Sequence, residues 1–363
     1  MKKQVVTAAL LATGAGCAMA QTSNVQIYGR LNIAIENMRT SANSAGQSVS
    51  VTREVNNRSV IGFRGSEDLG DGNKAIFQIE GTISPDTGEG AIAARDTRVG
   101  LEGKWGTLFG GHWITAYNGA TSGLDPWYPT TGGYMNLMAN GSGADVDNVS
   151  NVSSFDRRQS NSVHYWSPTW NGVQLRLTHG LSEERPASGA HPSLTSAAVI
   201  YDQGPWYLTA ATEIHHAYQG PGLKDQGSKI GAAYRFGDTR LAAVAEHLKY
   251  ETPTGDLKRN AFFVALTHQL GAHQLRLTAT RANDGSGSST TPKIGFLKKG
   301  PDTGATEYTI GDDYSLSKRT SVFLYYVHLH NEKNAVYDYP INPLTVSPGA
   351  TLRGASLGLR HYF

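Results

Sequence analysis

Apolar and polar residues alternate along most of the chain, which is the pattern of a β-strand with two different faces. In 25–35 the odd positions hold Val, Ile or Leu except for one Gly, whereas the even positions are mostly polar. Residues 74–80 alternate in the same way. The sequence Gln-Leu-Arg-Leu-Thr occurs at 174–178 and again at 274–278. These patterns predict an all-β protein.

Marking every such run predicts about sixteen strands, with boundaries uncertain by two to four residues. The predicted strands are 25–37, 51–64, 73–83, 95–104, 107–113, 157–167, 172–180, 195–203, 205–215, 227–236, 239–249, 258–269, 272–282, 304–314, 319–329 and 350–363.

The connections between these strands alternate in length. Short ones include 104–106, 202–205, 236–238 and 270–272. Long ones include 38–50, 84–94, 114–156, 181–194, 216–226, 283–303 and 330–349. Short turns at one rim and long loops at the other are typical of an outer-membrane barrel, and an even strand count leaves both termini at the short-turn rim.

Composition separates such a barrel from a soluble β-sandwich, which also alternates but points its apolar face inward. Only 17% of the 363 residues are charged, and they fall on one strand face and in the connections. Mean hydropathy is −0.36, and no run of 18 apolar residues is present that could form a membrane helix. We therefore predict a transmembrane antiparallel 16-stranded β-barrel with a polar lumen, closed because lipid cannot satisfy an open sheet edge.

Residues 1–20 have the pattern of a secretory signal peptide: Lys2 and Lys3, an apolar core over 5–11, and Ala-Met-Ala at 18–20. A buried N-terminal helix and lipidation at Cys17 are the alternatives. Cleavage leaves a barrel domain over 21–363 that has no cysteine and a net charge of zero instead of +2. Zero net charge gives no support for nucleic-acid binding.

With these segments in view, the chain resembles the general porins of Gram-negative bacteria, most closely the trimeric sixteen-stranded type of β-proteobacteria. The resemblance is carried by 62–80, by Arg-Val-Gly-Leu-Glu-Gly at 98–103, by Gly-Thr-Leu-Phe-Gly at 106–110, by 161–168, by Tyr-Ser-Leu-Ser-Lys-Arg-Thr at 314–320 and by the terminal Phe363. These segments are spread over nearly the whole mature chain. In such barrels the last strand with its terminal aromatic residue is the assembly signal.

The resemblance implies a homotrimer of water-filled barrels in the outer membrane, in contact with lipid and lipopolysaccharide and inserted by the barrel-assembly machinery. It also implies that the third long loop, 114–156, folds inward and narrows the pore opposite a wall of basic residues. The matching basic positions are Arg30, Arg58, Arg64, Arg98 and Arg158, and the acids of the loop include Asp125, Asp145 and Asp147. The family pattern is broken at Asn32, where an acid is common, and at Gly111-His112, where Arg-Gln is common.

These features predict a passive diffusion channel for ions and small hydrophilic solutes, with mild anion preference from the fixed arginine charges. Pairing of those arginines with the lumenal acids Glu36, Glu80 and Glu102 would weaken the preference. The alternatives are a substrate-selective anion porin and a non-conducting adhesin or structural barrel. No catalytic motif is present, and we expect no enzyme activity, cofactor or metal; His328 and His330 share a strand face but lack a third ligand.

Overall fold

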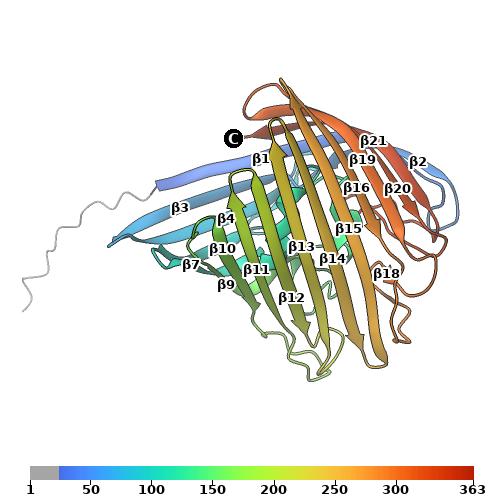
Figure 1. Ribbon diagram of the computed structural model, residues 1–363, viewed down its shortest axis with the longest axis horizontal. Coiled ribbons are helices and arrows are strands. Elements are labelled where there is room, and N and C mark those ends of the chain that lie inside the picture. Colours follow the sequence, from blue (N-terminus) through green and yellow to red (C-terminus); the bar gives the residue numbers. More distant parts are fainter. Residues whose placement is uncertain (1–23) are drawn as a thin grey trace, which may run out of the picture.

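The computed structural model describes residues 24–363, so the predicted signal peptide over 1–20 lies outside the described residues. One large antiparallel sheet holds nineteen strands in the described chain. Two pairs of strands, β2/β3 and β5/β6, each form one interrupted strand of the wall, and β8 belongs to a loop, so the wall is a closed 16-stranded barrel (Figure 1). The sixteen-strand prediction is confirmed.

The strands of the wall run as follows. They are β1 Asn24–Thr40, β2 Val49–Asn56, β3 Val60–Gly70, β4 Asn73–Ser84, β5 Glu89–Ala91, β6 Thr97–Gly103, β7 Gly106–Ile114, β9 Asp156–Trp166, β10 Val173–Gly180, β11 Ser193–Gln203, β12 Trp206–His216, β13 Lys224–Phe236, β14 Thr239–Thr252, β15 Gly255–Leu270, β16 His273–Ala282, β19 Ala305–Ser315, β20 Thr320–Asn331 and β21 Thr351–Tyr362.

The remaining elements lie in the connections. They are α1 Ala116–Thr121, the 3₁₀ turns η1 Ser122–Leu124, η2 Tyr134–Asn136 and η3 Met138–Asn140, and the short strands β8 Ser142–Val146, β17 Lys293–Ile294 and β18 Leu297–Lys298. None of the helices in the described part of the chain is long and apolar enough to cross a membrane.

Pairing of the first and last strands closes the barrel. Residues of β1 from Arg30 to Thr40 pair with β21 from Tyr362 back to Leu352. Phe363 extends this ladder, because its N–H and C=O both bond to Gly29 at 3.1 Å. A Cβ at Gly29 would lie only 2.3 Å from the Phe363 ring, so glycine leaves the space that the terminal aromatic ring occupies.

One outer connection differs from the predicted pattern. The predicted strands 239–249 and 258–269 extend to Thr252 and back from Gly255 in the structure, so only two residues join β14 to β15. The alternation continues through Tyr250 and Leu257, both fully buried on the inward face. This buried packing holds the hairpin together beyond the point where the sequence suggests a loop.

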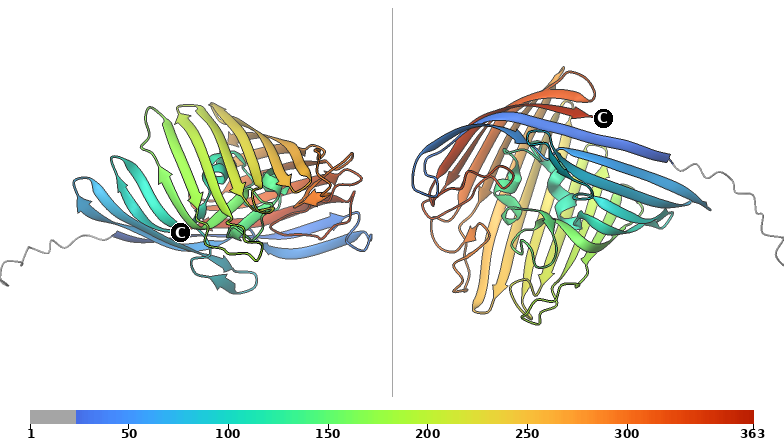
Figure 2. Two further views of the ribbon diagram at one scale, coloured as in Figure 1. Left: turned by 90° about the horizontal axis from the view of Figure 1, so that it is seen from below. Right: turned by 180° about the vertical axis from the view of Figure 1, so that it is seen from behind.

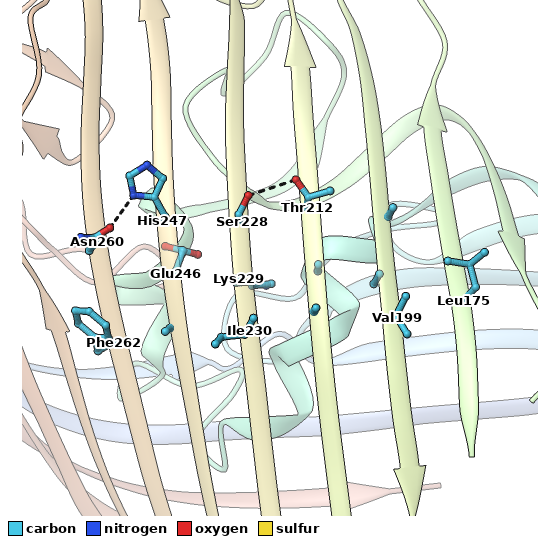
Figure 3. Close-up of a pocket in the computed structure, with 15 residues that line it drawn as sticks. Leu175, Val199, Thr212, Ser228, Lys229, Ile230, Glu246, His247, Asn260 and Phe262 are labelled. Carbon is cyan, nitrogen blue, oxygen red and sulfur yellow. Dashed lines mark hydrogen bonds between the residues drawn. The ribbon is translucent and has the colours of Figure 1, made fainter. Parts of the chain in front are cut away.

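The outward face of the wall is apolar over most of its height. Val199, Ile230 and Phe262 are 48%, 62% and 46% exposed on the outside of β11, β13 and β15 (Figure 3). Polar outward residues are paired across strands nearer the long-loop rim: the His247 ring contacts Asn260 at 2.7 Å, and Thr212 contacts Ser228 at 3.4 Å. At the short-turn rim the aromatic residues Trp105, Trp170, Trp206 and Phe236 are exposed, as expected for an interfacial girdle.

The predicted polar lumen does not reach all of the wall, because β13, β14 and β15 also carry apolar side chains on their inward face. On β13, β14 and β15 the inward positions include Ala233, Val244 and Phe263, all buried. These inward side chains are shielded from water, because the loop between β7 and β9 packs over them. The runs 241–245 and 261–266 are nearly continuous in apolar residues, which is the sequence pattern of strands buried on both faces.

Candidate pore constriction

The connection 115–155 lies inside the barrel, as expected for the loop predicted over 114–156. Figure 2 shows its short helical turns within the ring of strands. Most of its described side chains are buried, and they form three apolar clusters with inward residues of β1, β2 and β11 to β21. Phe155 belongs to one cluster, Leu124 and Met138 to a second, and Trp127 to the third. Apolar packing therefore fixes the loop against one half of the wall.

Two glycines of β13 make room for this loop. A Cβ at Gly227 would lie 2.7 Å from the Phe155 ring, and one at Gly231 would lie 2.8 Å from Leu124. Both distances are shorter than real carbon contacts, so a larger residue would push the loop away from the wall. The small side chains of this strand are thus required by the position of the loop.

A buried carboxylate, Glu246 on β14, anchors the loop by hydrogen bonds. It accepts from the Tyr117 hydroxyl at 3.0 Å and from the backbone N–H of Ala139 at 2.9 Å and 3.1 Å. The Arg259 guanidinium of β15 neutralises it at 3.2 Å, with both side chains almost fully buried. One acid of the wall therefore holds the beginning and the middle of the loop together.

Donors of the wall also hold the side of the loop that faces the short-turn rim. The Tyr207 hydroxyl donates to the Ala120 carbonyl at 2.6 Å, and the Arg276 guanidinium donates to the Pro126 carbonyl at 2.7 Å. Arg240 donates to the Gly123 carbonyl at 3.4 Å. These bonds satisfy carbonyl groups of a segment that has little regular structure of its own.

Arg58 connects the opposite half of the wall to the loop. It lies between β2 and β3 in a left-handed conformation with φ of 56°, so a break in the strand rather than simple alternation turns its side chain inward. Its guanidinium donates to the Tyr128 hydroxyl at 3.2 Å and to the Ser142 hydroxyl. Among the described residues no carboxylate lies within ion-pair distance of Arg58.

Three more of the predicted basic residues lie on this half without an acidic partner in the described chain. Arg30 donates to the Arg58 carbonyl at 2.7 Å. Arg64 donates to Gln26 at 3.0 Å and lies 4.9 Å from the centre of the Tyr28 ring. Arg98 lies 4.4 Å to 5.1 Å from the rings of Phe109, Trp113 and Trp166. Aromatic faces attract a cation without neutralising it, so these arginines keep their positive fields.

The fifth predicted arginine is paired, and so is one that the sequence did not single out. Arg158 donates to Asp96 at 2.7 Å, and Arg95, which precedes β6, donates to Glu80 at 3.0 Å. Glu36 lies 3.4 Å from Arg53. Two of the three lumenal acids thus do pair with arginines, but with arginines other than those of the predicted basic wall. Arg95 lies three residues before the family motif that begins at Arg98. No other feature of the sequence indicated a role for Arg95.

The acids of the loop are less available to the pore than the sequence suggests. Asp125 is buried, and its carboxylate accepts from the backbone N–H groups of Trp127 and Tyr134 at 2.9 Å and 2.8 Å. Burial raises the pKa of Asp125 to about 7, although these hydrogen bonds act in the opposite direction. At neutral pH it therefore carries less than a full negative charge.

The other two predicted loop acids lie farther along the loop. Partial burial raises the pKa of Asp147, but hydrogen bonds from Val149 and Ser150 outweigh it and hold that pKa below its ordinary value. Asp147 is thus a surface turn residue that stays ionised. The side chain of Asp145 lies outside the described residues, and its role stays a prediction.

A second loop, 332–350 between β20 and β21, also folds inward, which the sequence did not indicate. Tyr337 and Tyr339 are 1% and 0% exposed. Tyr337 accepts from Arg259 at 3.0 Å, and Asn342 donates to Thr131 of the pore loop at 2.8 Å. The Arg259–Glu246 pair therefore joins both inward loops to one point of the wall.

A closed transmembrane-length barrel, an inward loop and a row of uncompensated arginines beside that loop define a β-barrel channel with a charged narrow zone. No group of three or more potential metal-ligating side chains occurs among the residues that the structure describes. The family model of the Gram-negative porins matches residues 7–334. The chain belongs to this family, and it is a passive channel of the outer membrane.

Similar proteins cover essentially the whole chain. Outer membrane porin protein 32 of Delftia acidovorans is 26% identical over 100% of both chains. An outer membrane porin protein of Bordetella pertussis is 25% identical over 90% of this chain and 93% of that protein. The solved structure of the anion-selective porin from Comamonas acidovorans has a TM-score of 0.77 at 23% identity, covering 94% of this chain and 100% of that one. This structural likeness supports the fold.

Proposed function

We propose that this porin has a mild preference for small anions over cations and carries out no chemical reaction. The observation that carries the proposal is the imbalance of charge beside the pore loop. Arg30, Arg58 and Arg98 have no carboxylate within ion-pair distance in the described chain, whereas the nearby acids Glu80 and Asp96 are already paired with other arginines. Low-dielectric walls focus the field of such fixed charges in the narrow zone.

Reversal potentials of the purified protein in a planar bilayer under a KCl gradient test this proposal. The expected sign corresponds to higher permeability for chloride than for potassium, and the preference should weaken as salt screens the arginines. A reversal potential of the opposite sign would overturn it. The structurally similar Comamonas porin is itself named as anion-selective, which is compatible with this expectation.

The two alternatives raised by the sequence are tested on the same barrel. The loops 115–155 and 332–350 both occupy part of the lumen, and a plugged, non-conducting adhesin or structural barrel would show no conductance in single-channel recording. A substrate-selective anion porin would instead conduct and discriminate among anions of equal charge. Liposome swelling with neutral sugars and with organic acids separates that function from general diffusion.

We propose further that the protein is a homotrimer, as the resemblance implied and as the trimer form of Vibrio cholerae OmpT illustrates for a similar fold with a TM-score of 0.66. Ile92, in the segment between β5 and β6 of the loop that joins β4 to β6, is 86% exposed, the highest value among the large apolar side chains of the described chain. We therefore choose it as the position at which to test a contact between subunits.

Replacing Ile92 by Asp is expected to shift detergent-solubilised trimers toward monomers, because a charge cannot be buried without a partner. Native mass measurement in detergent checks the shift. Thr87→Asp places the same charge at an exposed position of the same loop and should leave the trimer intact. An unchanged trimer in Ile92→Asp would show that this loop does not contribute to assembly.

The remaining proposals concern export and insertion. We propose that 1–20 is cleaved on export and that the last strand with Phe363 is recognised by the barrel-assembly machinery. The Phe363 side chain is 41% exposed in the closed barrel, and its backbone completes the closing ladder. The residue proposed as the assembly signal therefore also takes part in barrel closure. The outward apolar surface is in place to contact membrane lipid and lipopolysaccharide.

A further inference from the structure

The turn 316–319 between β19 and β20 lies within the Tyr-Ser-Leu-Ser-Lys-Arg-Thr segment that the channel mechanism has not used. It borders a pocket of about 170 Å³ at the short-turn end of the lumen. The pocket is lined mainly by polar and charged side chains, among them Arg276, Asp313, Lys318, Arg319 and Arg360. Pockets for organic ligands are typically 300 Å³ or more, so this one suits a small inorganic ion.

The charges of the pocket are strongly unbalanced. Asp313 is its single acid, and it is shared between Arg276 at 2.9 Å and Arg360. Lys318 and Arg319 are exposed and have no carboxylate within ion-pair distance in the described chain. Four cations against one carboxylate leave a net charge of +3 inside a partly enclosed space, which attracts anions of higher valence more strongly than monovalent ones.

The donors in this pocket are partly preorganised. Arg276 is held by Gln274 at 2.8 Å and by the Pro126 carbonyl of the pore loop at 2.7 Å. Arg360 donates to Ser321 at 3.2 Å, while its buried Nε has no hydrogen-bond partner in the described structure. Guanidinium groups fixed in this way can bind a tetrahedral oxyanion with little loss of entropy.

The pocket is continuous with the basic wall of the constriction. In the ladder that closes the barrel, Arg30 is the direct partner of Tyr362, and Asn32 is the direct partner of Arg360. Arg30 in turn donates to the backbone of Arg58. Arg58, Arg30 and Arg360 therefore lie in succession between the pore loop and the turn 316–319.

We propose that this pocket is a low-affinity binding site for phosphate-class oxyanions at the periplasmic mouth, placed at the end of the basic wall. This inference rests on the proposed anion preference and extends it, because multivalent oxyanions would bind transiently in the pocket whereas chloride would not. An ion bound there narrows the path of chloride and adds negative charge beside it. Phosphate added from the periplasmic side should therefore reduce the chloride current.

The test compares chloride currents through single channels before and after millimolar inorganic phosphate is added to one side of the bilayer and then to the other. The wild type should show a stronger reduction from one side. In the variant Lys318→Ala/Arg319→Ala, the reduction of the chloride current by phosphate from that side should be at least about threefold smaller than in the wild type. This is the effect expected from removing two solvent-screened charges. Both residues lie in an exposed turn, so the barrel should fold normally.

Lys104→Ala/Arg235→Ala is the matched control, because it removes the same two charges from exposed positions at other short turns. It should retain the one-sided reduction. Equal reduction in the Lys318→Ala/Arg319→Ala variant and in the wild type, or none in an anion-preferring wild type, would overturn the oxyanion site alone. Cation preference or absence of conductance in the wild type would overturn the proposed function and this inference with it.

Discussion

Glu246→Ala is expected to release the pore loop and to raise single-channel conductance, with larger current fluctuations. The substitution removes the acceptor of the Tyr117 hydroxyl and of the Ala139 N–H, and it leaves the buried Arg259 without its counter-charge. Removing one partner of a buried pair costs about 3–5 kcal/mol. If all of that cost falls on loop docking, the ratio of docked to undocked loop drops by more than about a hundredfold.

The fold of the barrel can be monitored separately from the loop. Limited proteolysis should cut 115–155 in the variant while the heat-modifiable mobility of the barrel persists, because sixteen paired strands do not depend on this carboxylate. Glu251→Ala is the control on the same strand, since Glu251 is partly exposed and pairs with Lys249 at the rim. Wild-type conductance and proteolysis in Glu246→Ala would show that apolar packing alone holds the loop.

Arg58→Glu is expected to lower the chloride-to-potassium permeability ratio by roughly fivefold, enough to abolish or reverse a mild anion preference. Arg58 contacts the loop at Tyr128 and Ser142 and has no acidic partner in the described chain, so its charge acts directly on the passing ion. In water, a change of two unit charges is worth about 1 kcal/mol for an ion about 8 Å away. The change acts with opposite sign on chloride and on potassium, and screening by salt reduces the combined effect to roughly 1 kcal/mol. Reversal potentials in a KCl gradient measure the change.

Arg185→Glu is the matched control for this experiment, because it makes the same charge change in the exposed outer loop 181–192. It should leave the reversal potential nearly unchanged, since salt screens an exposed distant charge. A wild-type reversal potential in Arg58→Glu would contradict our assignment of Arg58 to the selectivity of the pore. Equal shifts in both variants would instead indicate that overall surface charge sets the preference.

The strands of this barrel were predictable because each spanning segment has lipid on one side. The regular alternation of 25–35 records that asymmetry in the sequence, so strand number and order followed from local pattern alone. The strand ends at Thr252 and Gly255 did not follow, because Tyr250 and Leu257 are buried by distant loop residues rather than by their neighbours in the chain.

The candidate site was predictable only in part. Resemblance located Arg58, but its inward direction depends on the left-handed break between β2 and β3. The pairing of Arg95 with Glu80 and the burial of Asp125 depend on contacts between segments far apart in the sequence. Glu246 had no local signal, since a single acid in an alternating strand has the same pattern whether it faces water or a folded loop.

The sequence by itself determined the membrane barrel, because the period-2 pattern and the alternating connection lengths are local properties of the chain. Only the tertiary structure decided how much of the lumen remains for solutes and which charges face it. The loops 115–155 and 332–350 both fold inward and meet through Arg259 and Glu246. Their position is set by apolar packing and buried ion pairs between distant segments, and such contacts leave no periodic trace in the sequence.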